Sequence, residues 1–182
     1  METRRACAHK YIEHNLCASL PSKSQRITSV VMIHHISIDI QDIIEKASAQ
    51  SANDFRALRI STNKVINEVY DDFVFMADQQ EAASLQIDFT SKMLRTKLGA
   101  HIVGFSSTPE EVVFDVAVND CRVDESLESL LAECILSNVL SWWYTLRNSD
   151  LSNLYAQRAN DAADEALHIL TPKFTTHRGR MF

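Results

Sequence analysis

The clearest pattern of apolar and polar positions lies between Asp124 and Leu170, where apolar residues recur at steps of three and four. This spacing places them on one face of an α-helix, and such a face is normally buried. The first such stripe consists of Leu127, Leu130, Leu131, Cys134, Ile135, Val139, Trp142 and Trp143. The second consists of Leu151, Leu154, Tyr155, Ala159, Ala162, Ala163, Ala166, Leu167 and Leu170.

A short polar segment, Asn148-Ser149-Asp150, separates the two stripes. Such side chains bond to their own backbone, and we expect Ser149 to cap the second helix. Because the connection is so short, the two helices are predicted to pack antiparallel, and the small alanines allow a close approach.

Two further helices are predicted upstream. One runs from about residue 39 to 49 with Asp39 as its cap, and the polar run 48–53 indicates a break after it. The other is capped by Asp78 and ends near Gly99. Its predicted buried stripe is Ala82, Leu85, Phe89, Met93 and Leu94 or Lys97.

Apolar and polar residues alternate from Val112 to Val118, which is the best strand signal in the chain. A single strand is not stable alone, so it must pair with another segment or another copy of the protein. The nearest internal candidate is Phe73–Met76. The residues from Ile36 to Ile40 also alternate, but the apolar spacing that follows favours a helix. Gly104 and Pro109 predict a loop.

The 182 residues include only three glycines and three prolines, so helix should dominate. The predicted fold is mainly α: a small helical bundle with a C-terminal antiparallel helix hairpin, one or two short β-strands and extended terminal arms. We expect a basic N-terminal arm at 1–32, one helical domain at 33–170 and an extended C-terminal arm at 171–182. The first segment could also be an organelle transit peptide, or it could precede a natural start at Met32.

Charge and hydropathy narrow the function classes. A net charge of -6 argues against a protein that wraps nucleic acid, since phosphate neutralisation needs clustered Lys and Arg. No apolar run approaches the roughly 20 residues that a membrane span needs, and no secretory signal is evident. We therefore expect an intracellular, soluble protein.

Nothing in the motifs indicates catalysis. The chain has no phosphate-binding glycine loop, no nucleophile elbow and no zincin helix, and caps and turns explain its aspartates. We expect neither an enzyme nor a bound cofactor. Four residues have zinc-ligand identities, but their spacing fits no standard zinc module. These are Cys7, His9, His14 and Cys17. A small helical regulatory or metal-binding protein therefore remains the alternative.

The densest aromatic cluster is Trp142-Trp143-Tyr144. Adjacent residues on a helix cannot all face inward, so we expect Tyr144 to point away from the core and to be an interface residue. The C-terminal arm is basic and β-branched, which suits addition as a strand to a neighbour's sheet. Its candidate interface residues are Lys173, Phe174, Thr175, Thr176, His177, Arg178, Arg180, Met181 and Phe182.

The order of these features resembles the small head-to-tail connector proteins, or adaptors, of tailed bacteriophages, particularly those of phages from Bacteroides-like hosts. The resemblance covers roughly residues 36–182. It is carried by Tyr70–Asp78 before a long helix, by Val113–Val116, by Leu140–Tyr144, by the helix 150–170 and by the basic tail.

The resemblance implies a structural virion protein at the head-to-tail junction, made in the host cytoplasm. Its copies would form a ring, expected to be a dodecamer, that docks to the portal protein and bridges to other neck or tail ring proteins. DNA would pass through the channel during ejection without specific binding. The C-terminal arm would contact the portal or a neighbouring subunit.

Overall fold

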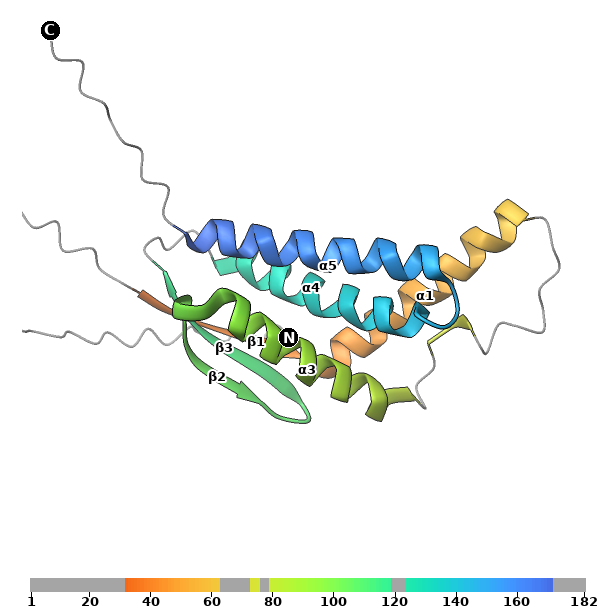
Figure 1. Ribbon diagram of the computed structural model, residues 1–182. Helices are drawn as coiled ribbons and strands as arrows, with labels where there is room; N and C mark the ends of the chain where they lie inside the picture. The colour runs from red at the N-terminus through yellow and green to blue at the C-terminus, as the bar shows by residue number, and fades with distance from the viewer. Residues whose placement is uncertain (1–31, 63–72, 76–78, 119–123, 172–182) are drawn as a thin grey trace, which may run out of the picture.

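The computed structural model describes residues 32–62, 73–75, 79–118 and 124–171 (Figure 1). Its elements, in chain order, are β1 (Met32–Asp39), α1 (Ile40–Thr62), α3 (Gln80–Leu98), η2 (Gly99–His101), β2 (Ile102–Ser107), β3 (Glu111–Val118), α4 (Asp124–Tyr144) and α5 (Ser149–Leu170). The mainly helical fold and the C-terminal helix hairpin are confirmed. The sheet has three strands, rather than the one or two predicted.

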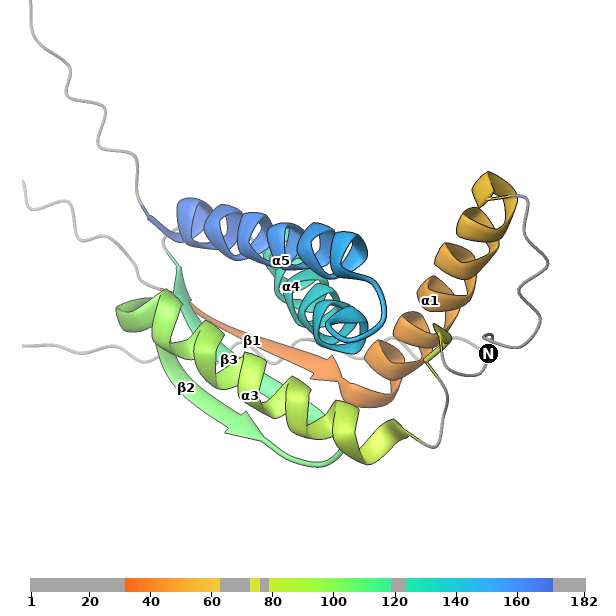
Figure 2. The same ribbon diagram turned by 45° about the vertical axis from the view of Figure 1, so that its right-hand side comes forward.

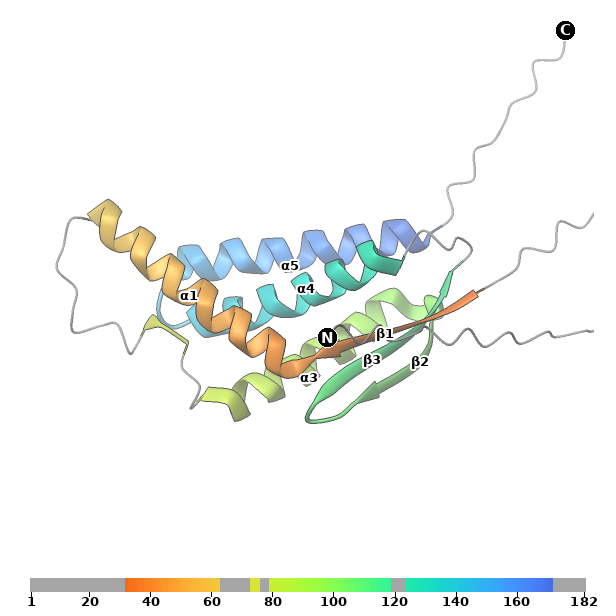
Figure 3. The ribbon, with the colours of Figure 1, turned by 180° about the vertical axis from the view of Figure 1, so that it is seen from behind.

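The helices that pack on the sheet all lie on one of its faces. Figure 2 shows the α4–α5 hairpin above the sheet, α3 along it, and α1 leading away from the end of β1. Seen from behind, no described helix covers the opposite face of the three strands (Figure 3). The alternating burial of β1 and β3 agrees with one buried and one open face.

The sheet has the order β1-β3-β2, with both pairs antiparallel. The strand predicted at 112–118 is confirmed, but Phe73–Met76 is the wrong partner for it. Phe73–Phe75 lies against helices instead: the Phe75 amide donates to Ser51 Oγ, and Trp143 Nε1 donates to the Phe73 carbonyl. The true partner is β1. It is hard to recognise in the sequence because its alternating apolar residues are followed without a break by the helical spacing of α1.

Gly104 does not lie in a loop, as predicted, but within β2, opposite Asp115 of β3. A side chain at this position would collide with the Asp115 carboxylate, which explains a glycine inside a strand. The turn lies at 108–110 and includes Pro109, and the Thr108 amide donates to the Glu111 carbonyl across it.

Of the two predicted caps at described helix starts, one is confirmed and the other is wrong. Asp39 Oδ1 accepts from the amides of Gln41 and Asp42 at 2.7 and 3.2 Å, so it caps α1 as predicted. α5 is capped by Asn148, whose Oδ1 accepts from the amides of Asp150 and Leu151, and not by Ser149. α1 also continues past the predicted break at 48–53, because Ser51 is buried and hydrogen-bonded there.

The buried stripe predicted for α3 is largely wrong. Leu85, Phe89 and Met93 are 69%, 56% and 46% exposed, although Leu94 is buried as predicted. The buried residues of α3 are Ala83, Ile87, Thr90, Ser91, Leu94 and Leu98. The hydroxyls of Thr90 and Ser91 donate to carbonyls one turn earlier, which satisfies them inside the core. A count of apolar residues alone could not find a buried face that contains two hydroxyl side chains.

The hairpin core agrees closely with the two predicted stripes. Six residues of the first stripe and six of the second are buried, and the alanines of α5 lie against α4. They are Leu127, Leu131, Cys134, Ile135, Val139, Trp143, Tyr155, Ala159, Ala162, Ala163, Ala166 and Leu170. Trp142 and Leu154 are more than one third exposed, so the two stripes are narrower than the sequence pattern.

Candidate interaction groove

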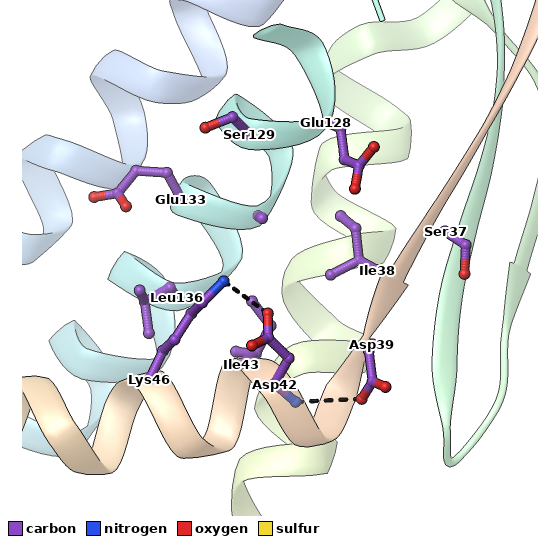
Figure 4. A pocket seen from close by; sticks show the side chains of 11 residues that line it. Ser37, Ile38, Asp39, Asp42, Ile43, Lys46, Glu128, Ser129, Glu133 and Leu136 are labelled. Atoms are coloured by element: carbon purple, nitrogen blue, oxygen red, sulfur yellow. Dashed lines mark hydrogen bonds and ion pairs between the residues drawn. The ribbon is translucent and has the colours of Figure 1, made fainter. Parts of the chain in front are cut away.

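A groove with a volume of about 600 Å³ lies between the end of β1, the first turns of α1 and the N-terminal half of α4 (Figure 4). We call it the β1–α4 groove. Its walls come from segments 37–46 and 128–136, which are far apart in the sequence. No local pattern in the sequence predicts this groove.

The floor of the β1–α4 groove is apolar. Ile38 and Ile43 are almost fully buried beneath it, and Ala132 and Leu136 of α4 are half-buried beside them. Ile38 points into the core because side chains of β1 alternate between the two faces of the sheet, and Ile43 lies on the buried face of the first turn of α1. An apolar floor of this kind can accept side chains of a second segment.

The rim of the groove is acidic. It carries the carboxylates of Asp39, Asp42, Glu128 and Glu133, and one ammonium group, that of Lys46. Lys46 Nζ lies 2.7 Å from Asp42 Oδ2, so this pair is neutral and three negative charges remain without a cationic partner in the groove lining. Such a rim attracts cationic side chains and repels anionic ones.

One wall of the groove is the outer edge of a strand. β1 is at the end of the sheet order, and no described strand pairs with its outer side. The Ile40 amide donates to the Glu110 carbonyl, so the even-numbered residues of β1 bond to β3. By the alternation of an antiparallel pair, the backbone groups of Ser37 point away from β3, toward the groove side. This edge can therefore accept an added strand.

The open face of the sheet carries a row of three residues across the strands: His35, Asp115 and Gly104. His35 Nδ1 lies 2.7 Å from Asp115 Oδ1, and both side chains are solvent-accessible. In a histidine–carboxylate pair the histidine can act as a general base, but catalysis also needs a pocket that excludes water. Neither the β1–α4 groove nor the smaller pocket between α3, α4 and α5 includes these residues, so we interpret the pair as a cross-strand contact.

A second exposed surface is the apolar stripe Leu85, Phe89 and Met93 on α3, which we call the α3 stripe. The three residues are spaced by four and lie on the face opposite the buried residues of the helix. Large apolar side chains that share one exposed helix face are typical of an interaction surface. The sequence pattern indicated an apolar face here, but assigned it to the protein's own core.

Tyr144 does not point outward, so its prediction as an interface residue is wrong. It is fully buried, and its hydroxyl donates to Asp54 Oδ2 of α1 at 3.0 Å. Tyr155 donates to the same oxygen at 2.7 Å, and the two rings stack at 5.8 Å. Burial, and next the Asp54 carboxylate, raise the pKa of both hydroxyls well above 10. The exposed ring of the aromatic cluster is Trp142.

The chemistry of the described residues offers little to a catalytic site. Cys134, the free cysteine among them, is buried, and this burial raises the pKa of its thiol to about 11. A thiol of that kind is a poor nucleophile at neutral pH. No group of three metal-ligating side chains occurs within residues 32–62, 73–75, 79–118 and 124–171.

Several predicted site residues lie outside the described residues. They are the four zinc-ligand candidates at 7, 9, 14 and 17, the proposed cap Asp78, and the arm residues Lys173, Phe174, Thr175, Thr176, His177, Arg178, Arg180, Met181 and Phe182. The terminal arms predicted at 1–32 and 171–182 lie outside as well, except Met32, which begins β1, and Thr171, whose amide donates to the Leu167 carbonyl.

No protein-family model, curated protein or solved structure matches this chain. Among the described helices, none is both long and apolar enough to cross a membrane.

Proposed function

We propose that this protein is a structural subunit whose copies assemble into a ring at the head-to-tail junction of a tailed bacteriophage. The ring docks to the portal, bridges to neck or tail components and leaves a channel through which DNA passes. The observation that carries the assembly is the outer edge of β1, which has no partner strand in the described structure and borders the acidic β1–α4 groove. Strand edges of this kind normally need cover.

A ring also requires two different surfaces on each copy, because its contacts are heterologous and must close. The α3 stripe supplies a second surface. In Figure 1 α3 lies in front of β1, and in Figure 3 β1 lies in front of α3, so the two surfaces are separate and one copy can offer each to a different neighbour. Leu85, Phe89 and Met93 would then be covered in the assembly.

The placement at the phage neck is supported by the resemblance to connector proteins, and the acidic balance of the chain is compatible with it. A net charge of -6 disfavours tight binding to DNA. A channel through which a duplex slides benefits from weak repulsion at its wall.

The assembly is tested by mass photometry and negative-stain imaging of the purified full chain over a concentration series. We expect ring-shaped particles, and we expect a Leu85→Glu and Phe89→Glu double variant to remain monomeric because it places charge in the covered stripe. Leu146→Glu is the matched control, since Leu146 is an apolar residue that is 93% exposed outside the stripe. A wild-type chain that stays monomeric at every concentration contradicts the proposal.

A further inference from the structure

We propose that the β1–α4 groove is the binding site for residues 171–182 of a second copy, which add to the outer edge of β1 as a short strand. This inference deepens the proposed function and rests on it, because it names the contact that links neighbouring copies.

Charge complementarity favours this occupant. The groove lining has three uncompensated carboxylates, whereas the segment 171–182 contains Lys173, Arg178 and Arg180 and no acidic side chain. The net side-chain charges of the groove lining and of the segment are therefore opposite in sign and equal in magnitude when His177 is neutral. Opposite potentials of this kind speed encounter and select against wrong partners. Arg178 and Arg180 can also each bind a carboxylate with two hydrogen bonds.

The strand edge supplies the second part of the contact. The outward backbone groups at Ser37 can pair with an extended segment, and the apolar floor at Ile38, Ala132 and Leu136 can accept its inward side chains. Phe174 and Thr176 share one face of an extended segment, and Thr175 has high strand propensity. The segment therefore offers an aromatic side chain for the floor and basic side chains for the rim.

Length allows the segment to reach another copy. It follows Leu170 at the end of α5, which lies beside the N-terminal end of α4 (Figures 1 and 3). Twelve residues in extended form span about 40 Å. If each copy inserts its segment into the next, this contact is heterologous, and together with the α3 stripe it gives a ring when the rotation between copies closes.

The test uses full-length chains with reversed charges. A groove variant carries Glu128→Arg and Glu133→Arg, and a tail variant carries Lys173→Glu, Arg178→Glu and Arg180→Glu. For each variant alone, the protein concentration at which half of the chains are assembled, measured by mass photometry, should rise by about tenfold or more. Mixed in equal amounts, they should assemble again, because each tail then meets a groove of opposite charge on the other variant.

A matched control and three outcomes make the test decisive. Glu165→Arg reverses an exposed charge on α5, outside the groove, and should leave assembly unchanged. Wild-type assembly by the groove variant alone would overturn this inference and leave the proposed function intact. If mixing fails while one chain carrying all five reversals assembles, the segment occupies its own groove, and the second-copy site is wrong. A wild-type monomer would defeat the proposed function itself.

Discussion

Replacing Asp54 with alanine is expected to destabilise the fold, because this carboxylate joins α1 to both helices of the hairpin. One of its oxygens accepts from the hydroxyls of Tyr144 and Tyr155, and the other accepts from Gln50 Nε2. Both tyrosines are 3% exposed or less, so in the folded protein both hydroxyls depend on this carboxylate as their acceptor.

The expected loss in the free energy of unfolding follows from the burial of these hydroxyls. A buried donor left without its acceptor costs about 1–3 kcal/mol, so two hydroxyls set an upper bound of about 6 kcal/mol. Asp54 is itself only half-buried, and water can enter the space that its side chain vacates. The expected loss in the free energy of unfolding is therefore about 2–3 kcal/mol.

Urea unfolding followed by tryptophan fluorescence measures this loss, and a double-mutant cycle assigns it. In a chain with Tyr144→Phe and Tyr155→Phe, the rings still pack but no hydroxyl needs an acceptor. Asp54→Ala should then cost less than about 1 kcal/mol. An equal loss in both backgrounds would refute the hydrogen-bond explanation and point instead to helix propensity in α1.

Three further predictions concern stability. Because the pKa of the Cys134 thiol rises from 9.0 to about 11 in the folded state, its contribution is present below pH 9 and is lost as the pH rises to about 11. Between these pH values the wild-type chain should lose about 2–3 kcal/mol of its free energy of unfolding through this thiol, and the Cys134→Ala variant should not show this loss when urea unfolding is measured across the pH range. Asn148→Ala should cost about 1 kcal/mol and Ser149→Ala about 0–0.5 kcal/mol in the same assay, and equal effects would contradict the observed cap. Gly104→Ala should destabilise the sheet by about 1–2 kcal/mol through its collision with Asp115, and the loss should be smaller in an Asp115→Ala background, where the carboxylate is gone but the Cβ of residue 115 still lies 3.1 Å from the added methyl group.

The hairpin could be predicted from the sequence because its signals are local. Each stripe lies within one helix, and Asn148–Asp150 breaks the pattern where the chain turns. Packing between two neighbouring helices requires no knowledge of the remaining chain. The same holds for the Asp39 cap, which bonds to amides two and three residues away.

The sheet and the groove could not be predicted in this way, because their partners are distant in the sequence. β3 was recognised as a strand, but its neighbours were not, since β2 contains a glycine and β1 merges into a helix. The groove combines residues near Asp39 with residues near Glu133, and each group has an ordinary local explanation as cap or solvent-exposed helix face. Only the fold shows that they meet at an open strand edge.

The pairing of β1 with β3 also has a consequence for how the chain folds. The paired residue numbers differ by 72 at Asp39–Glu111 and by 86 at Met32–Val118, so β1 leaves the ribosome long before its partner exists. Until then the isoleucines of β1 have no sheet to join, and closing so long a loop is slow compared with forming a helix hairpin. Docking of the first strand is thus a late event in biogenesis, and the nascent chain depends on dilution or chaperones to keep that strand from associating with other chains.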